Sequence, residues 1–167
     1  MIDVEAAEDR TAEMNKAAVL GMLAAAEREG LTAQADFFAE SVTNHGVPGT
    51  REDVRAVLQD ISATFPDAGF ELLDLVAEGE WVVVRCFLSG THLGAGRHPF
   101  VHEGLLAGVA PTGRYVRVQH IHMFRLRGGQ VVEHWGCRDD VGMMRQLGLP
   151  LEIAGAREAE KLSRKSV

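Results

Sequence analysis

The residues best suited to chemistry in this 167-residue chain are His120 and His122, followed by Trp135 and Asp139. Imidazole and carboxylate groups exchange protons near neutral pH, so this set is typical of general acid/base catalysis. An indole beside them would supply one wall of an apolar binding site. The residue types therefore predict a pocket in which a proton is moved.

A β-hairpin is the element expected to bring these side chains together. The adjacent glycines Gly128 and Gly129 are typical of a two-residue turn, here between predicted strands 114–126 and 130–137. If the register is unbroken, His122 lies opposite Trp135, and side-chain alternation gives each strand one inward face. The more apolar face carries His120, His122, Phe124, Glu133, Trp135 and Cys137.

This arrangement places both histidines inside and His134 on the opposite face. Asp139 follows where the second strand ends, so two imidazoles, an indole and a carboxylate converge at the end of an apolar trough. Buried polar groups without partners cost about 1–3 kcal/mol each. A ligand site would account for such a cluster.

Other interpretations of the same residues stay open. His120 and His122 could be two hydrogen-bonded core histidines, and Asp139 could instead be the N-cap of a final helix, a role that Asp140 could share. A His-x-His pair with a carboxylate could also bind a metal, but no third ligand stands at a recognisable spacing. Dinucleotide-binding, phosphate-loop and nucleophile-elbow motifs are absent. We therefore expect neither a metal nor another cofactor.

The remaining pattern places helices first and strands afterwards. Helices are predicted over 5–29, over 32–40, from a capping box at Thr50 and Asp53 to Phe65, and over 139–147; strands are predicted over 41–45, 70–77 and 81–92. Residues 93–113 are glycine-rich and irregular, with a broken strand expected over 103–109.

This order predicts an α+β fold, a curved antiparallel sheet with helices over its concave side. We expect a single domain over residues 1–150 and a polar tail over residues 151–167.

Composition narrows the classes of protein. Apolar residues make up 46% and charged residues 25% of the chain, a balance typical of soluble domains. A net charge of −7 argues against nucleic acid as a partner. Apolar runs such as Trp81–Val84 are too short to cross a bilayer, and the acidic N-terminus lacks a secretory signal. Cys86 and Cys137 are expected to be core residues in a reducing cytoplasm.

Several short motifs in order resemble one family. They are Asn44-His45, Phe65-Pro66-Asp67, Gly90-Thr91-His92, Glu133-His134-Trp135-x-x-x-Asp139 and Gln146-Leu147-Gly148. From about His45 to Gly148 the chain resembles the SnoaL-like polyketide cyclases, or ester cyclases, of the NTF2-like superfamily. This resemblance implies a cone-shaped barrel around an apolar cavity, a homodimer or homotetramer, and no cofactor. It implies ring closure by intramolecular aldol condensation of a polyketide-like hydrophobic small molecule.

The resemblance also implies roles. The Trp-x-x-x-Asp match makes Asp139 the expected base, with His120 and His122 as its catalytic partners. The substrate-binding residues are expected to be Trp135, Phe124 and Trp81 as cavity walls, Arg85 as an anion holder or as the partner of a buried acid, and His45 and His92 at the rim.

Three departures from the family touch this pocket. Many relatives carry an acidic residue where this chain has Gly136 and another where it has His122, and segment 93–110 is longer here. Within the superfamily, an epoxide hydrolase, a pericyclase and a non-catalytic module that carries a hydrophobic metabolite are the alternatives.

Overall fold

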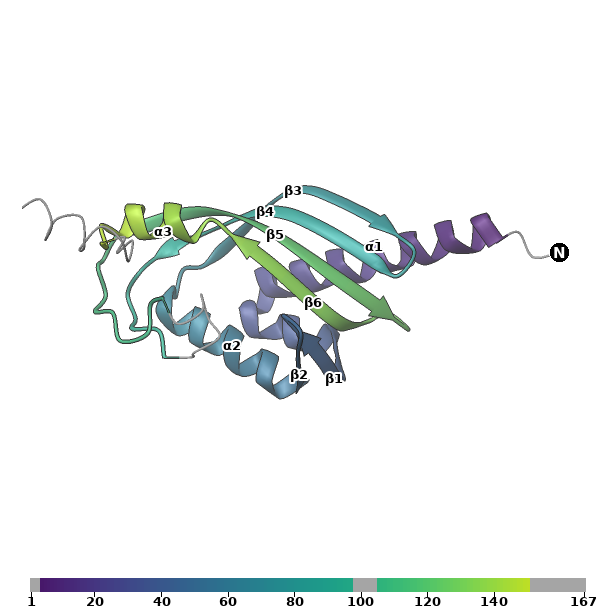
Figure 1. Cartoon of the computed structure of the whole chain (residues 1–167), viewed down its shortest axis with the longest axis horizontal. Coiled ribbons are helices and arrows are strands. Elements are labelled where there is room, and N and C mark those ends of the chain that lie inside the picture. The colour runs from purple at the N-terminus through teal and green to yellow at the C-terminus, as the bar shows by residue number, and fades with distance from the viewer. Residues whose placement is uncertain (1–3, 98–104, 151–167) are drawn as a thin grey trace, which may run out of the picture.

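The computed structural model describes residues 4–97 and 105–150, and Figure 1 shows two helices beneath a curved sheet. The helical elements are α1 (Val4–Glu29), the 3₁₀ helix η1 (Leu31–Phe37), α2 (Arg51–Thr64) and α3 (Asp140–Leu147). The strands are β1 (Phe38–Asn44), β2 (Val47–Thr50), β3 (Gly69–Glu78), β4 (Trp81–Thr91), β5 (Tyr115–Arg127) and β6 (Gln130–Arg138). The α+β class is confirmed.

The six strands form one open sheet in the order β2-β1-β6-β5-β4-β3. The expected cone-shaped, curved sheet is present, and it stays open because the edge strands β2 and β3 do not pair with each other among the described strands. Helices α1 and α2 cover the concave side, so the sheet curves around them without closing (Figure 1). The sheet is antiparallel as expected, except that β1 runs parallel to β6.

Most predicted elements are confirmed with shifted ends. The capping box is present, with the Asp53 amide donating to Thr50 Oγ1 at 3.3 Å and the Thr50 amide to Asp53 Oδ2 at 2.8 Å. The helix predicted over 32–40 is wrong in its last three residues, because η1 ends at Phe37 and Phe38 begins β1. Phe38 pairs with Val131 of β6 and is buried, which favours an extended backbone there.

The long connection between β4 and β5 differs from expectation. Within residues 105–109 the structure shows an isolated bridge from Ala107 to Gly96 in place of a strand. The first part of the predicted strand, and the predicted tail over 151–167, lie outside the described residues. None of the described helices is long and apolar enough to span a membrane.

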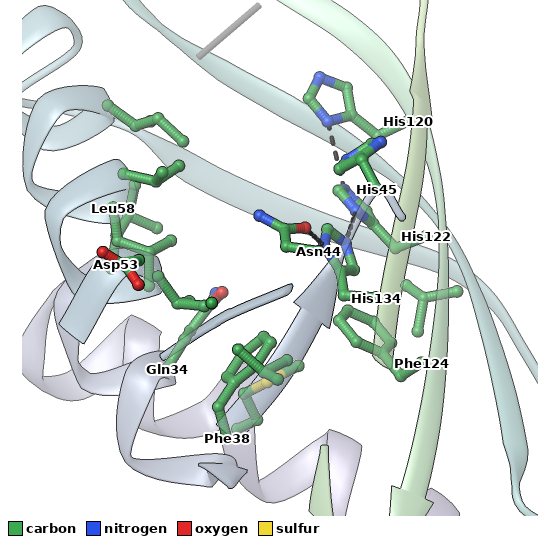
Figure 2. Close-up of a pocket in the computed structure, with 18 of the residues that line it drawn as sticks. Gln34, Phe38, Asn44, His45, Asp53, Leu58, His120, His122, Phe124 and His134 are labelled. Atoms are coloured by element: carbon green, nitrogen blue, oxygen red, sulfur yellow. Dashed lines mark hydrogen bonds between the residues drawn. The ribbon is translucent and has the colours of Figure 1, made fainter. Parts of the chain in front are cut away.

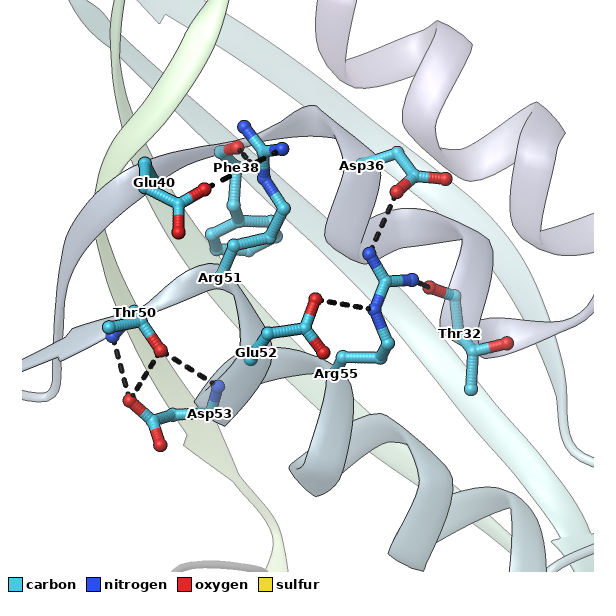
Figure 3. A network of polar contacts seen from close by, with 9 residues as sticks. All are labelled: Thr32, Asp36, Phe38, Glu40, Thr50, Arg51, Glu52, Asp53 and Arg55. Atoms are coloured by element: carbon cyan, nitrogen blue, oxygen red, sulfur yellow. Dashed lines mark hydrogen bonds and ion pairs between the residues drawn. The ribbon is translucent and has the colours of Figure 1, made fainter.

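Polar contacts fix the helical side of the fold (Figure 3). Arg55 of α2 donates to Asp36 Oδ1 at 2.8 Å and to the Thr32 carbonyl at 3.4 Å, both in η1. Arg51 donates to the Phe38 carbonyl at 2.8 Å. Two arginines on one helix thus position η1 and the start of β1, the segments that line the cavity described next.

Candidate active site

A cavity of about 580 Å³ lies between the concave face of the sheet and the helices. This volume suits a drug-sized organic ligand. Its walls are mainly apolar, with side chains such as Met22, Phe38, Val42, Val54, Leu58 and Phe124. Polar side chains concentrate on the sheet wall, at the end of β1 and along the middle of β5 and β6 (Figure 2).

Three histidine rings follow one another along that wall. His120 Nδ1 lies 3.3 Å from His122 Nε2, and His122 Nδ1 lies 3.0 Å from His134 Nε2. His134 Nδ1 lies 2.8 Å from Asn44 Oδ1 (Figure 2). Phe124 stacks against two of the rings, with centroids 5.9 Å from His122 and 5.0 Å from His134. We call His120, His122, His134 and Asn44 the histidine chain.

A β-bulge puts His134 in this chain. Leu126 pairs with Val131, but Arg125 pairs with Glu133, so Val132 is an extra residue on β6. Beyond the bulge every β6 side chain changes face, and the predicted unbroken register is wrong. His134 and Arg138 therefore point inward, whereas Glu133, Trp135 and Cys137 do not share the face of His120 and His122. The bulge lets Val131 stay in the core opposite Leu126.

Gly136 makes room for the middle ring. It pairs with His122 across the strands, and a Cβ at this position would lie 3.1 Å from His122 Nδ1 and 3.6 Å from His45 Cε1. Few Cβ atoms in proteins are found so close to a neighbour. The His122 ring thus occupies the space beside Gly136 that a larger side chain would need.

The hydrogen-bond pattern sets the proton positions. Asn44 Oδ1 can only accept, so His134 donates from Nδ1. Neutral His134 then accepts at Nε2 from His122 Nδ1, and His122 Nε2 accepts from His120 Nδ1. All three rings are neutral in this order, and each fixes the tautomer of the next. The chain leaves the lone pair of His120 on Nε2.

Burial and nearby charge keep His122 and His134 neutral. Burial is the main cause that lowers the pKa of His122 to about 4, and the charges of Arg138 and His45 lower it further. Burial also holds the pKa of His134 well below its ordinary value, with His122, His45 and Arg138 adding to the effect. Arg138 lines the cavity and pairs with Asp140 at 3.4 Å. The sheet wall therefore combines neutral bases with a fixed positive charge.

Four of the predicted site residues line the cavity: His120, His122, His45 and Phe124. His45 follows β1 with a positive φ of 51°, and its ring packs edge-on against His134 with centroids 5.4 Å apart.

Asp139 is not among the cavity-lining residues. It is exposed, and its Oδ1 accepts from the Gly142 amide at 2.8 Å as the N-cap of α3. The structure thus supports the N-cap role that the sequence left open.

Three further predicted residues belong to the other face of the sheet. Trp135 is 41% exposed and donates to Glu133 at 2.9 Å. Trp81 lies beneath Arg125, and Arg85 pairs with Asp74 at 2.5 Å. This carboxylate is exposed, so the ion pair is present but its acid is not the buried one expected. None of the three lines the cavity.

His92 is fully buried but lies away from the cavity. The Thr112 amide donates to its Nδ1 at 3.2 Å, and the His92 amide donates to the Arg114 carbonyl at 2.9 Å. These bonds join the end of β4 to the start of β5. His92 therefore stabilises the connection between these two strands and is not part of the cavity wall.

The polar cavity residues that the sequence reasoning missed include Asn44, His134, Arg138 and Gln34. Asn44 and His134 stood in the quoted motifs, and only the assumption of an unbroken hairpin kept His134 outside. The residue types in Glu133-His134-Trp135 do not by themselves show which of the three side chains faces inward. No sequence pattern marked Arg138 or Gln34 as a site residue.

The cysteines divide between the two faces. Cys86 lines the cavity, and burial raises the pKa of its thiol to about 11, so it is a neutral thiol near pH 7. Cys137 is exposed, which corrects the expectation of a core residue and follows from the bulge. Within residues 4–97 and 105–150 no group of three or more His, Cys, Asp or Glu side chains has an arrangement that could hold a metal ion.

Comparison with known proteins places this cavity in a family. The family model described as SnoaL-like polyketide cyclase matches residues 16–147. The nogalonic acid methyl ester cyclase of Streptomyces nogalater is 27% identical over 116 residues, which cover 69% of this chain and 79% of that protein.

Solved structures agree. The candidate polyketide cyclase IdmH of Streptomyces antibioticus is 30% identical with a TM-score of 0.63, over 81% of this chain and 99% of that one. The candidate hydroxylase AclR of Streptomyces galilaeus is 27% identical with a TM-score of 0.64, over 81% and 97%.

Proposed function

Because the chain belongs to the SnoaL-like polyketide cyclase family, we propose that it closes a ring in a hydrophobic polyketide-like substrate by acid/base chemistry of the aldol type. The observation that carries this proposal is the histidine chain on the wall of an apolar cavity. In this chain the base is imidazole, and Asp139 serves the fold.

The proton would move as follows. His120 Nε2 removes a proton from a carbon between two carbonyl groups of the substrate, and the resulting carbanion attacks a second carbonyl carbon in the same molecule. The new alkoxide takes the proton back from His120. The product has the same atoms as the substrate. His122 and His134 hold the His120 tautomer and share the positive charge through their hydrogen bonds.

The low basicity of the chain limits the substrate class. Burial lowers the pKa of His122 to about 4 and holds the pKa of His134 well below its ordinary value, so these two rings bind a proton only weakly when it is shared along the chain. Weak bases remove only protons that are already acidic, as in a β-dicarbonyl unit whose carbanion is delocalised. A poly-β-keto ester fits this requirement, whereas an ordinary ketone does not.

Arg138 would supply the compensating charge. Its guanidinium lines the same cavity, and its partner in the sheet is His120. A fixed cation near a developing enolate oxygen stabilises the transition state at no reorganisation cost, commonly by a few kcal/mol. The same charge that weakens the imidazoles as bases would therefore favour the anion that they create.

Relatives supply a direct experiment. The purified protein is incubated with nogalonic or aklanonic acid methyl ester, the compounds in the names of curated relatives, in water enriched in ¹⁸O. We expect a cyclic isomer of unchanged mass that does not form with the His120→Gln variant. Release of methanol and a free acid that carries ¹⁸O in its carboxyl group would point to ester hydrolysis. Bound but unchanged ester would point to a carrier module.

We also propose a homodimer formed through the convex face of the sheet. Val76, Val83, Met123 and Trp135 pair in one row across four strands, and Val76, Met123 and Trp135 are 60%, 40% and 41% exposed. Such a row of apolar side chains is typical of an interface. We expect light scattering to show a dimer that Met123→Glu converts to a monomer, whereas Leu20→Glu on exposed α1 leaves it intact.

Cysteine usage supports a cytoplasmic location, which we propose as well. Cys86 and Cys137 are both free thiols. Free thiols of this kind persist in a reducing compartment.

A further inference from the structure

Gln34 stands apart from the histidine chain as a second polar point in the cavity. It belongs to η1 on the helical wall, and its side chain lines the cavity while the residue is only 8% exposed (Figure 2). Its amide nitrogen Nε2 is buried and has no hydrogen-bond partner among the described residues. Buried amide groups are normally paired, so this donor needs an explanation.

Packing does not require an amide at this position. The neighbours that line the same wall, Leu31 and Leu58, are apolar. The nearby polar side chains of η1 and α2 are already engaged, since Arg55 binds Asp36 and Glu52. An apolar residue of the same length would fill the space without leaving a donor unpaired.

We infer that Gln34 is a specificity-determining residue that donates a hydrogen bond to an acceptor oxygen of the substrate, such as a ketone or ester carbonyl. The donor and the histidine chain lie on the helical and sheet walls of one cavity. A substrate that satisfies both carries an acceptor oxygen at one end and its acidic carbon at the other. This inference deepens the proposed function and rests on the same cavity, but its test requires no turnover.

The test uses two probes of equal shape, 2-acetylnaphthalene and 2-isopropylnaphthalene, of which only the first has an acceptor oxygen. Binding of each to the whole protein is measured by calorimetry, for the wild type, Gln34→Met and the control Leu31→Met. Methionine keeps the length of glutamine without its donor, and Leu31 lines the cavity from the same helix. We expect Gln34→Met to weaken the ketone about 5- to 10-fold and to leave the hydrocarbon unchanged. Leu31→Met should leave the ratio of the two affinities within twofold of wild type.

Thermal unfolding without ligand gives an independent readout. We expect Gln34→Met to melt at a higher temperature than wild type, because it removes a buried donor that only the ligand satisfies. A purely structural glutamine would give a lower melting temperature. An unchanged ketone-to-hydrocarbon ratio in Gln34→Met, or a lower melting temperature, would overturn the inference. Failure of ring closure with the expected probe ratio would instead count against the proposed reaction alone.

Discussion

His122 Nδ1 lies 3.0 Å from His134 Nε2, and this contact links a side chain of β5 to one of β6. The two rings are nearly parallel, with an angle of 21° between their planes. Since the outer end of the chain is an amide oxygen that can only accept, the whole series has one direction, from Asn44 toward His120. Each part of this arrangement can be altered separately.

The Asn44 anchor can be removed without touching the rings. We expect Asn44→Leu to lower kcat about 10- to 100-fold, the usual cost of losing a group that orients a functional histidine, with a smaller change in KM. The reason is that His134 is then free to adopt either tautomer. Steady-state kinetics with whichever methyl ester the wild type cyclises measure this change. Thr43→Val on the same strand is the matched control. A kcat within twofold of wild type would show that the anchor is dispensable.

The space over Gly136 can be filled. Alanine there would bring a methyl group to 3.1 Å from His122 Nδ1, so the ring must shift and its bond to His134 must lengthen. We expect at least a tenfold loss of turnover and a rise in the pKa of His122 as its ring becomes more hydrated. NMR titration of the histidine rings measures the pKa change. Gly69→Ala, where the nearest side-chain atom is 4.0 Å away, should change neither. An unshifted His122 resonance would argue against the tight approach.

The charge of Arg138 can be deleted. Because this cation lowers the pKa of both His122 and His134, Arg138→Gln should raise both values, although burial will still hold them below that of free histidine. We nevertheless expect turnover to fall, since the enolate loses its cation. The combination of stronger bases and a slower enzyme separates this role from simple pKa tuning. Faster turnover in the variant would contradict it.

Folding stability should depend on pH through the buried rings. His122 titrates near pH 4 in the folded state and near 6.5 in the unfolded chain, so between these values the unfolded state binds more protons. The contribution of the neutral ring to the free energy of unfolding is therefore fully present above about pH 6.5. It falls as the pH is lowered toward 4, by up to about 1.4 kcal/mol per pH unit for each such ring. His134 and His92, whose pKa values are also lowered, add to this slope.

Denaturant titrations between pH 4 and 7.5 would measure the slope. We expect the His122→Phe variant to show a shallower dependence over the same window. An equal slope in wild type and variant would mean that His122 is already hydrated or charged in the folded protein.

Much of the fold was predictable because it depends on local chemistry. Glycines at 128 and 129 adopt the positive φ values, 56° and 78°, that a tight hairpin turn needs. Thr50 and Asp53 form the capping box that starts α2. The parallel pairing of β1 with β6 was not predictable, since the partners are about 90 residues apart and no local pattern specifies them.

The site was harder to predict than the fold because one extra residue decided it. Side-chain alternation assigned His120 and His122 correctly to the cavity, but Val132 is bulged out of register and reverses every later residue of β6. The resemblance drew attention to Asp139 by its spacing from Trp135, yet both side chains lie outside the cavity. The place of Gln34 in the cavity depends on which side of η1 faces the sheet, and the pattern of a single sequence does not show this.

The most direct test of imidazole as the base compares His120→Gln with Asp139→Asn in the ring-closing assay, with folding checked by circular dichroism. Asparagine is as good an N-cap as aspartate, so Asp139→Asn should keep kcat/KM within about threefold of wild type. Loss of the base in His120→Gln should cost about 10²- to 10⁴-fold. The reverse pattern, with His120→Gln active and Asp139→Asn inactive, would contradict the central role of the histidine chain.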